Sequence, residues 1–226
     1  MTVNLISFTV PCIDEIPLDS DIVDLVAYCA RVSNPSNQLN TETSDKLIRY
    51  LIKHKHWSPF EMANAVLEIE TTRDIARQIL RHRSFTFQEF SQRYADPTKD
   101  LSFTTREARL QDQKNRQNSI ETDDVVLQDM WRKLQEKVTN EALSAYKWAI
   151  SKGIAKEVAR AVLPEGLTMS RMYVNGTIRS WIHYIDIRSD MATQKEHREI
   201  ALACAKAIAD IFPMITEFAH EESRSE

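Results

Sequence analysis

Glycine is scarce in this chain, with only three glycines among 226 residues. Nucleotide-binding loops of the Rossmann and P-loop kinds depend on closely spaced glycines, because the backbone must approach the phosphates. Neither G-x-G-x-x-G nor G-x-x-x-x-G-K-[ST] occurs in the sequence. A chain of this length can still bury a substantial hydrophobic core without disulfide bonds. The sequence therefore indicates a globular protein that must bind any nucleotide by another route.

The hydrophobic pattern predicts an α+β fold, rich in helices, with a small and mostly antiparallel sheet. Strands are expected at residues 3–10, 65–71 and 168–174, and residues 84–94 are expected to be extended. Residues 96–118 are polar and lack a sustained period, so they are expected to form a long loop or lid. No linker or internal repeat divides the sequence, so we expect a single domain over residues 1–226.

Helix starts are expected at residues that can cap an N-terminus. These are Ser20, Thr43, Thr72, Thr122, Thr177 and Thr193. The helix after Thr72 is expected to run to about Arg83, and the long helix after Thr122 to stop at Gly153. A short helix is expected between Ala155 and Pro164, and the last helix should break near Pro213.

The pattern of cysteines and apolar residues indicates in which cellular compartment the protein works. Cys12, Cys29 and Cys204 are scattered and odd in number, which favours a reduced intracellular protein over a disulfide framework. Residues 1–15 show no signal-peptide pattern, and no run of about 20 apolar residues is present. We therefore expect a cytoplasmic protein that does not contact a membrane.

Positive charge is concentrated in one stretch of an acidic chain. The net charge is −4 and the pI about 5.9, yet residues 73–93 hold five arginines and His82 against Asp74 and Glu89. Such a cluster indicates a local anionic ligand, although a solvated helix face explains it equally well. The alternative function is nucleic-acid binding by this cluster, with Phe85 and Phe87 as stacking side chains; the low pI speaks against it.

The second half of this cluster can hold polar ligands. Arg77 and Arg81 are four residues apart, so on a helix they share a face. Alternate side chains of an extended segment point the same way, which would align Glu89, Ser91 and Arg93. A guanidinium, a hydroxyl and a carboxylate together can bind a phosphate and the polar edge of a base or sugar.

A specific resemblance lies in the same stretch. Arg81-His82-Arg83, followed after seven residues by Ser91, resembles the signature of the flavin-dependent thymidylate synthases. Its usual continuation is matched by Glu89, Arg93 and Tyr94. The sequence departs from the commoner form at Thr86, where serine is usual, and at Gln88, where asparagine is usual. Both replacements keep hydrogen-bonding ability.

Further blocks resembling this family follow in order. They are residues 56–61, 114–119, 157–164 and 177–188. The resemblance covers roughly residues 20 to 210, and it implies the fold of the thymidylate synthase-complementing proteins.

The resemblance also implies ligands and their contacts. The substrate would be dUMP, the cofactor FAD, and the co-substrates methylenetetrahydrofolate and NADPH. The implied FAD contacts are Ser58, Arg81, His82, Arg83, Glu89, Thr177, Arg179 and His183. The implied dUMP contacts are Gln78, Arg81, Glu89, Phe90, Ser91, Gln92, Arg93, Arg160 and Arg188. His56 would lie by the reacting centre, and Arg188 would stabilise the uracil anion without a covalent protein nucleophile.

Helix periodicity adds a prediction about assembly. Arg179, His183 and Asp186 fall on one helix face, whereas Arg188 points nearly to the opposite side. Arg179 and Arg188 should therefore not serve one pocket within a single subunit. The family builds each active site from several chains of a tetramer, so we expect a homo-oligomer in which Arg188 is donated across an interface.

Simpler roles remain for several of these side chains. Ser91 could be a nucleophile, but a hydroxyl needs a positioned base, and a hydrogen bond to substrate fits it better. His54 and His56 lack a third ligand, so no metal site is expected. Cys204 is expected in the core, and three tryptophans in the core or an interface: Trp131, Trp148 and Trp181.

Two further alternatives stay open. The basic residues of the 96–118 loop are expected on a solvated face or a lid: Arg106, Arg109, Lys114 and Arg116. An inactive homologue that binds flavin without turnover is disfavoured, because suitable residues occupy all the implied site positions.

Overall fold

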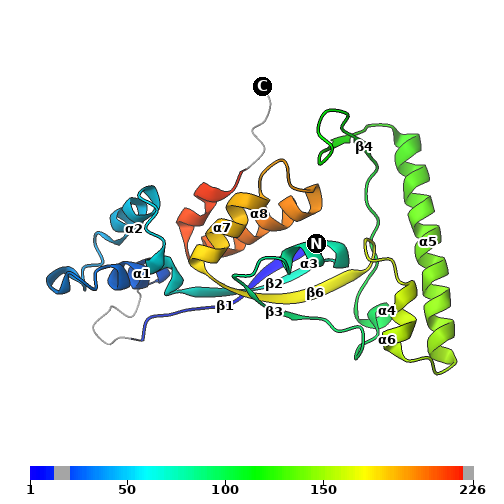
Figure 1. Ribbon diagram of the computed structural model, residues 1–226, viewed down its shortest axis with the longest axis horizontal. Coiled ribbons are helices and arrows are strands. Elements are labelled where there is room, and N and C mark those ends of the chain that lie inside the picture. Colours follow the sequence, from blue (N-terminus) through cyan, green and yellow to red (C-terminus); the bar gives the residue numbers. More distant parts are fainter. Residues whose placement is uncertain (13–20, 221–226) are drawn as a thin grey trace.

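A four-stranded sheet crosses the molecule in the computed structural model, which describes residues 1–12 and 21–220 (Figure 1). The strand order is β1-β2-β6-β3, and each neighbouring pair is antiparallel. The strands are β1 (Thr2–Phe8), β2 (Asn64–Thr72), β3 (Thr86–Glu89) and β6 (Met169–Thr177). The predicted helix-rich α+β fold with a small antiparallel sheet is confirmed.

Helices cover one face of the sheet and extend beyond both of its ends (Figure 1). Over the sheet lie α3 (Arg73–Ile79), α7 (Ile178–Arg188) and α8 (Lys195–Ala209). At one end stand α1 (Ile22–Ala30) and α2 (Ser44–Lys53), and at the other stands α5 (Val125–Ser151). In the part of the chain described here, no helix has both the length and the apolar character needed to cross a membrane.

Short elements connect these helices and strands. They are α4 (Pro97–Asp100), α6 (Lys156–Ala159), the β4 (Arg109–Gln111) and β5 (Ser119–Glu121) hairpin, and the 3-10 turns η1 (Pro35–Asn37), η2 (Ser58–Glu61), η3 (Arg160–Val162) and η4 (Pro213–Phe218). The predicted 96–118 loop therefore contains α4 and β4. The predicted short helix before Pro164 and the break near Pro213 are confirmed.

Alternation along the two central strands creates the core. Ala65, Leu67 and Ile69 of β2 are fully buried, whereas Glu68 and Glu70 point to the other face. On β6, Met172 and Val174 are buried in the same way. A strand with period-two alternation can bury one face against helices and leave the other polar. The predicted strand at residues 65–71 is confirmed, and the one at residues 168–174 extends to Thr177.

Helix caps were predicted with mixed success. Thr177 caps α7, because its hydroxyl accepts a hydrogen bond from the Ser180 amide at 3.1 Å. Thr43 and Thr72 occupy the capping positions of α2 and α3 without a side-chain capping bond. The other three predicted starts were wrong or untested: the caps are Asp21, Asp124 and Gln194, and Ser20 lies outside the described residues. Aspartate is as good a cap as serine or threonine, which is why neighbouring positions compete.

The stretch after α3 is more compact than predicted. The helix ends at Ile79 rather than near Arg83, and the extended part covers β3 only. After Glu89 the chain turns, because the amides of Tyr94 and Ala95 both donate to the carbonyl of Ser91, at 3.1 and 3.0 Å. The prediction that Glu89, Ser91 and Arg93 share one side of a strand was therefore wrong.

Helix α5 is joined to the body by side-chain amides. Gln135 donates to the carbonyl of Arg106 and accepts from its amide, both at 2.8 Å. Gln128, seven residues earlier, makes the same pair of bonds with Ala108 at 2.7 and 2.9 Å. Seven residues is close to two helical turns, so both glutamines lie on one face. Gly153, with φ 77°, follows the helix where the stop was predicted.

The predicted core positions of cysteine and tryptophan are buried over the sheet but exposed on α5. Cys204 is fully buried, and Trp181 is fully buried over the sheet. Trp131 and Trp148 on α5 are 43% and 58% exposed. They are not core residues of this chain, which leaves the interface alternative for them.

Candidate active site

The turn between α3 and β3 carries Arg81, His82 and Arg83, and it packs against α7. Gly176 makes this packing possible, because a Cβ there would lie 2.2 Å from the ring of Phe85. Phe85 in turn stacks on Trp181 with ring centroids 4.5 Å apart. The His82 ring meets Tyr184 edge-on at 5.0 Å. This close approach of β6, the turn and α7 fixes where the imidazole of His82 points.

Arg188, the last residue of α7, reaches the same imidazole. Its Nε donates a hydrogen bond to Nε2 of His82 at 2.9 Å. Burial, together with the positive charges of Arg188 and His183, lowers the pKa of His82 to about 4. A neutral imidazole can accept at Nε2 while carrying its proton on Nδ1. The bond orients the guanidinium of Arg188 through Nε and leaves its terminal NH groups for another partner.

Gln78 lies beside this pair, on α3. Its Nε2 donates to Oε1 of Gln194 at 2.9 Å, and its Oε1 lies 3.1 Å from Nδ1 of His197. His197 is completely buried and also contacts the hydroxyl of Tyr184 at 3.2 Å. Burial, with the charge of Arg188, lowers the pKa of His197 to about 3. The substrate-contact candidate Gln78 is thus held by residues of α8 that sequence reasoning missed.

Glu89 ends β3 among positive and hydroxyl groups. It forms an ion pair with Arg77 and lies 3.8 Å from a guanidinium nitrogen of Arg73. The hydroxyl of Ser170 donates to it at 2.8 Å. The predicted pairing of Arg77 with Arg81 on one helix face was wrong, since α3 ends before Arg81.

The turn after β3 lies next to α6. Arg93 forms an ion pair with Glu157 at 3.3 Å, and the ammonium of Lys156 donates to the carbonyl of Tyr94 at 2.7 Å. Arg160 begins the next turn of the same segment. The candidates Ser91, Arg93 and Arg160 are therefore brought close although they are far apart in sequence. Phe90 is half-buried, and its amide donates to the carbonyl of Arg171 at 2.9 Å.

The remaining candidates lie at the other end of α7. Arg179 forms an ion pair with Glu61 of η2, and Ser58 begins that turn. Thr177 caps α7 and His56 precedes η2, so these two belong to the same end of the molecule. His183 lies in the middle of α7, close enough to His82 to lower its pKa. His183 and His56 are exposed. Nine residues separate Arg179 from Arg188, about 14 Å along a helix axis. Arg179 and Arg188 thus stand at opposite ends of α7, and their service to different pockets stays a prediction.

Three of the candidate arginines are free to bind an anion. Within residues 1–12 and 21–220, the side chains of Arg81, Arg83 and Arg160 make no hydrogen bond or ion pair. Arg81 and Arg83 are exposed. Gln92 is 3% exposed, and its Nε2 has no partner among the described residues. Guanidinium groups suit phosphate and pyrophosphate ligands, so this turn fits the anionic parts of FAD or of a nucleotide.

Other chemistries have less support in the geometry. The hydroxyl of Ser91 accepts from the amide of Arg93 at 3.3 Å, and no histidine base contacts it within the described residues. Over that same part of the chain, no three histidine, cysteine or acidic side chains are grouped as metal ligands. Phe85, a stacking candidate for nucleic acid, is 6% exposed. It is a core residue, so the nucleic-acid alternative loses its best support.

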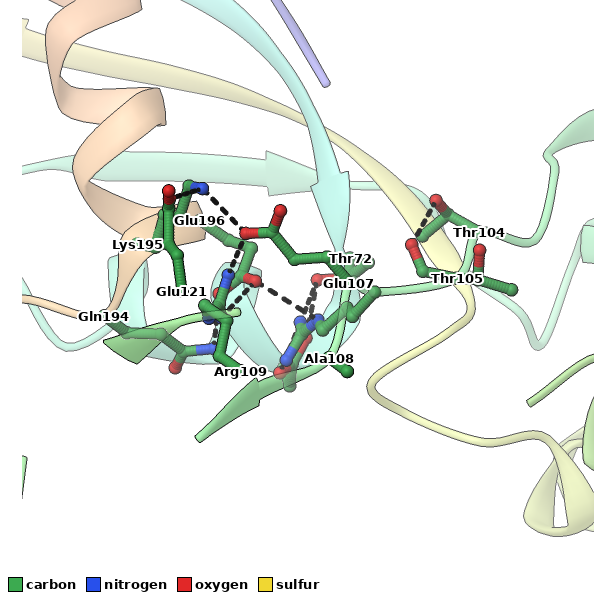
Figure 2. Close-up of polar contacts among 12 residues, drawn as sticks. Thr72, Thr104, Thr105, Glu107, Ala108, Arg109, Glu121, Gln194, Lys195 and Glu196 are labelled. Carbon is green, nitrogen blue, oxygen red and sulfur yellow. Dashed lines mark hydrogen bonds and ion pairs between the residues drawn. The ribbon is translucent and has the colours of Figure 1, made fainter. Parts of the chain in front are cut away.

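The basic loop residues divide between an ionic network and solvent. Arg106 bonds Asp74 at 2.8 Å, and Arg109 bonds Glu196 at 2.6 Å. Figure 2 shows Arg109 among Gln194, Lys195 and Glu196 at the start of α8. Lys114 and Arg116 are exposed. A signal for this network existed in the sequence, because Gln194 to Arg198 is a polar run at the start of an otherwise apolar helix.

Comparisons with known proteins agree with this geometry. The family model described as thymidylate synthase complementing protein matches residues 18–214. A probable flavin-dependent thymidylate synthase of Paramecium bursaria Chlorella virus 1 is 47% identical over 217 residues, covering 96% of this chain and 98% of the relative. The flavin-dependent thymidylate synthase of Synechocystis sp. is 50% identical over 217 residues, covering 95% and 97%.

A solved structure shares the fold. The crystal structure of a UMP/dUMP methylase, PolB from Streptomyces cacaoi, bound with 5-Br dUMP, superimposes with a TM-score of 0.77. It is 24% identical, and the match covers 96% of this chain and 93% of that one. This likeness concerns the fold. The family model and the near full-length relatives show that the chain belongs to the family of flavin-dependent thymidylate synthases.

Proposed function

We propose that this enzyme methylates dUMP at C5 to give dTMP, with FAD as cofactor. The observation that carries the proposal is the pair formed by Arg188 and His82, which joins the end of α7 to the Arg81-His82-Arg83 turn. A guanidinium fixed through Nε can present its terminal N–H groups to a carbonyl oxygen of uracil. Such preorganised donors stabilise negative charge as it develops.

Residues of several elements would hold FAD. They are Ser58, Arg81, His82, Arg83, Glu89, Thr177, Arg179 and His183. When bound and reduced by NADPH, the flavin would supply the hydride that turns the transferred carbon into a methyl group. Methylenetetrahydrofolate would donate that carbon, and His56 would lie beside the reacting atoms.

Arginines would fix the charged end of dUMP. Arg81, Arg93 and Arg160 would neutralise the phosphate, and the remaining substrate contacts would come from Gln78, Glu89, Phe90, Ser91, Gln92 and Arg188. Uracil C5 is a poor nucleophile until charge builds up on its ring carbonyls. A guanidinium is a fixed positive charge rather than a proton shuttle, so Arg188 would favour that charged form while the C5 proton leaves. No protein side chain needs to bond to the ring.

We propose further that active sites are shared in a homo-oligomer, most simply a tetramer, in which Arg188 and the His82 that it bonds are contributed together across an interface to a site completed by another chain. Two observations support this. Arg179 and Arg188 are nine residues apart on α7, about 14 Å along a helix axis. In addition, large apolar side chains of α5 are exposed, including Leu134 at 55%, Met130 at 58% and Val138 at 54%. Exposed apolar patches mark protein interfaces, and a second copy of this chain is the partner we propose.

We also propose that the chain acts as a single domain and works in the cytoplasm. The described cysteines, Cys12, Cys29 and Cys204, are all unpaired, which is usual in reducing compartments.

The test begins with the purified protein. We expect it to bind FAD, which gives a yellow flavin spectrum, and to form dTMP from dUMP, methylenetetrahydrofolate and NADPH. Sedimentation should show a mass several times 26.2 kDa. A protein that cannot be loaded with FAD, or that forms no dTMP when loaded, would refute the proposed function.

A further inference from the structure

A chain of hydrogen bonds runs from α7 through Gln78 to the start of α8. The hydroxyl of Tyr184 contacts Nε2 of His197 at 3.2 Å, and Nδ1 of His197 contacts Oε1 of Gln78 at 3.1 Å. Nε2 of Gln78 donates to Oε1 of Gln194 at 2.9 Å. Gln194 then donates from Nε2 to Oε2 of Glu196, also at 2.9 Å. Five side chains on three helices are thus connected in series.

An ion pair at one end of this hydrogen-bond series fixes the direction in which its members donate. Glu196 is 5% exposed, and its Oε1 accepts from Arg109 at 2.6 Å (Figure 2). A buried carboxylate needs such a charged partner. Although burial opposes ionisation, the hydrogen bond from Arg109 and others keep the pKa of Glu196 lowered. An ionised carboxylate only accepts hydrogen bonds.

The acceptor role of Glu196 determines which group donates in each of the other hydrogen bonds of the series. Because Glu196 accepts, Gln194 must turn its NH₂ group toward Glu196 and its oxygen toward Gln78. Gln78 must therefore donate to Gln194 and turn its own oxygen toward His197. His197 must in turn carry its proton on Nδ1 and accept at Nε2 from the hydroxyl of Tyr184. A histidine tautomer is set in this way by the partner of its other nitrogen.

The consequence concerns the half-buried amide of Gln78. Its Oε1 is held on His197 and one N–H of Nε2 is held on Gln194, so the donor it still offers a ligand is the second N–H of Nε2. Uracil presents carbonyl oxygens, which accept such a bond. Cytosine presents an amino group in place of one carbonyl, and an amino group cannot accept.

We propose that Gln194, Glu196 and His197 are positioning residues that lock the amide of Gln78 as a hydrogen-bond donor and so favour dUMP over dCMP. This inference rests on the proposed function, in which Gln78 contacts the substrate. A site built to hydrogen-bond one group rejects an analogue that leaves its polar atoms unpaired. None of the three positioning residues needs to touch the substrate.

A matched pair of variants at one position tests the lock. In His197→Asn, the side-chain amide can occupy the place of Nδ1 and still donate to Gln78. In His197→Gln, the amide reaches the place of Nε2 and loses the contact with Gln78. The measurement is the ratio of the dCMP dissociation constant to the dUMP dissociation constant, taken by titration of the flavin absorbance of the FAD-loaded enzyme.

We expect the wild-type ratio to be retained within about threefold in H197N and to fall about tenfold in H197Q, since one hydrogen bond is worth about a factor of ten. Gln194→Ala, which removes the lock from the α8 side, should lower the ratio to a similar extent without altering the buried histidine. If H197Q does not fold, the ratio measured for Q194A replaces it in the test. Glu217→Gln, at an exposed ion pair with Arg49, is the control and should leave the ratio unchanged.

The outcomes separate the two proposals. An enzyme that binds dUMP and forms dTMP, with the same ratio in wild type, H197Q and Q194A, would overturn the positioning role alone. A fall in dUMP affinity matched by an equal fall in dCMP affinity would also overturn it, because that pattern indicates general loosening. A wild-type protein that binds neither nucleotide and forms no dTMP would overturn the proposed function itself.

Discussion

The sheet region and the α5 region are stabilised in different ways. Over the sheet, large side chains such as Trp181 and Tyr184 are completely buried. Helix α5 contributes to a separate small cluster around Tyr146, and its glutamines bond the backbone of the neighbouring segment. Leu134 and other apolar side chains of α5 remain exposed. The sheet region therefore buries its large side chains within one chain, whereas α5 keeps an exposed apolar surface, which we propose a second chain covers.

The two regions also differ in the groups they carry. The sheet region holds two imidazoles with lowered pKa values, the half-buried His82 and the fully buried His197. Helix α5 contains no histidine at all. Acid should therefore weaken the sheet region first, and charge placed on the α5 surface should disrupt the assembly without unfolding a chain.

The largest expected effect is acid destabilisation of the sheet region. The pKa values are about 4 for His82 and about 3 for His197, against an ordinary 6.5 in the unfolded chain. Below pH 6.5 the unfolded state binds more protons than the native state, so stability falls as the pH falls toward 4. Two such groups cost about 5 kcal/mol or more over this range. Urea unfolding at pH 7, 6, 5 and 4 measures the loss.

A control separates the imidazoles from the carboxylates, which also titrate. His197→Asn removes one buried imidazole and should flatten the pH dependence above pH 5. An unaltered slope between pH 6.5 and 5 in that variant would contradict the assignment to His197.

The next largest effect is expected on the α5 surface. Leu134→Glu puts a carboxylate into the apolar stripe, which should cost roughly 3 kcal/mol of interface free energy. Sedimentation should show a smaller assembly, with helix content unchanged and dTMP formation largely lost. The control is Asn140→Glu, which adds the same charge at an exposed position on another side of α5. An L134E protein of wild-type mass would show that the stripe is not the interface.

A smaller effect tests how α5 is held. Gln135 is 4% exposed and makes two bonds to the backbone of Arg106. Gln135→Ala should cost about 2 kcal/mol, since each lost bond is worth about 1 kcal/mol. The loss is measured as a lower midpoint of thermal unfolding and as faster hydrogen exchange of the Arg106 amide. Gln113→Ala, in the exposed loop, should have no effect. Equal unfolding midpoints for the two variants would mean that the segment is held by other contacts.

The smallest effect is expected at an exposed ion pair. Arg49 and Glu217 are paired with side chains 57% and 46% exposed. Arg49→Ala should change the free energy of unfolding by less than about 1 kcal/mol, because solvent screens such pairs. Urea unfolding at low and high salt would check this, and a larger cost would show that α2 and η4 are held mainly by charge.

Local pattern predicted much of the fold. The alternation in β2, the cap at Thr177 and the stop at Gly153 each depend on a few neighbouring residues, so the sequence displays them directly. The end of α3 and the turn at Ser91 were not predicted. Both lie beside long-range contacts. After α3, Phe85 stacks on Trp181 beside Gly176, and these rings are 96 positions apart in the sequence. Before the turn at Ser91, the amide of Phe90 donates to the carbonyl of Arg171, 81 positions away.

The candidate site shows the same limit. The Arg81-His82-Arg83 motif was visible because its members are adjacent. The hydrogen bond of Gln78 to Gln194 spans 116 residues and that to His197 spans 119, so no local pattern could reveal them. The contact of Arg188 with His82 spans 106 residues. This hydrogen bond could be recognised only from the structure, in which α7 packs against the Arg81-His82-Arg83 turn.

The central claim is that Arg188, and no protein nucleophile, drives the methylation of dUMP. Its most direct test compares single-turnover dTMP formation by Arg188→Ala and Ser91→Ala at saturating dUMP, with flavin content measured for each. We expect R188A to lose at least about 100-fold in rate with FAD still bound, and S91A to stay within about tenfold of wild type. Wild-type turnover by R188A, or no turnover by S91A with dUMP bound, would contradict the account.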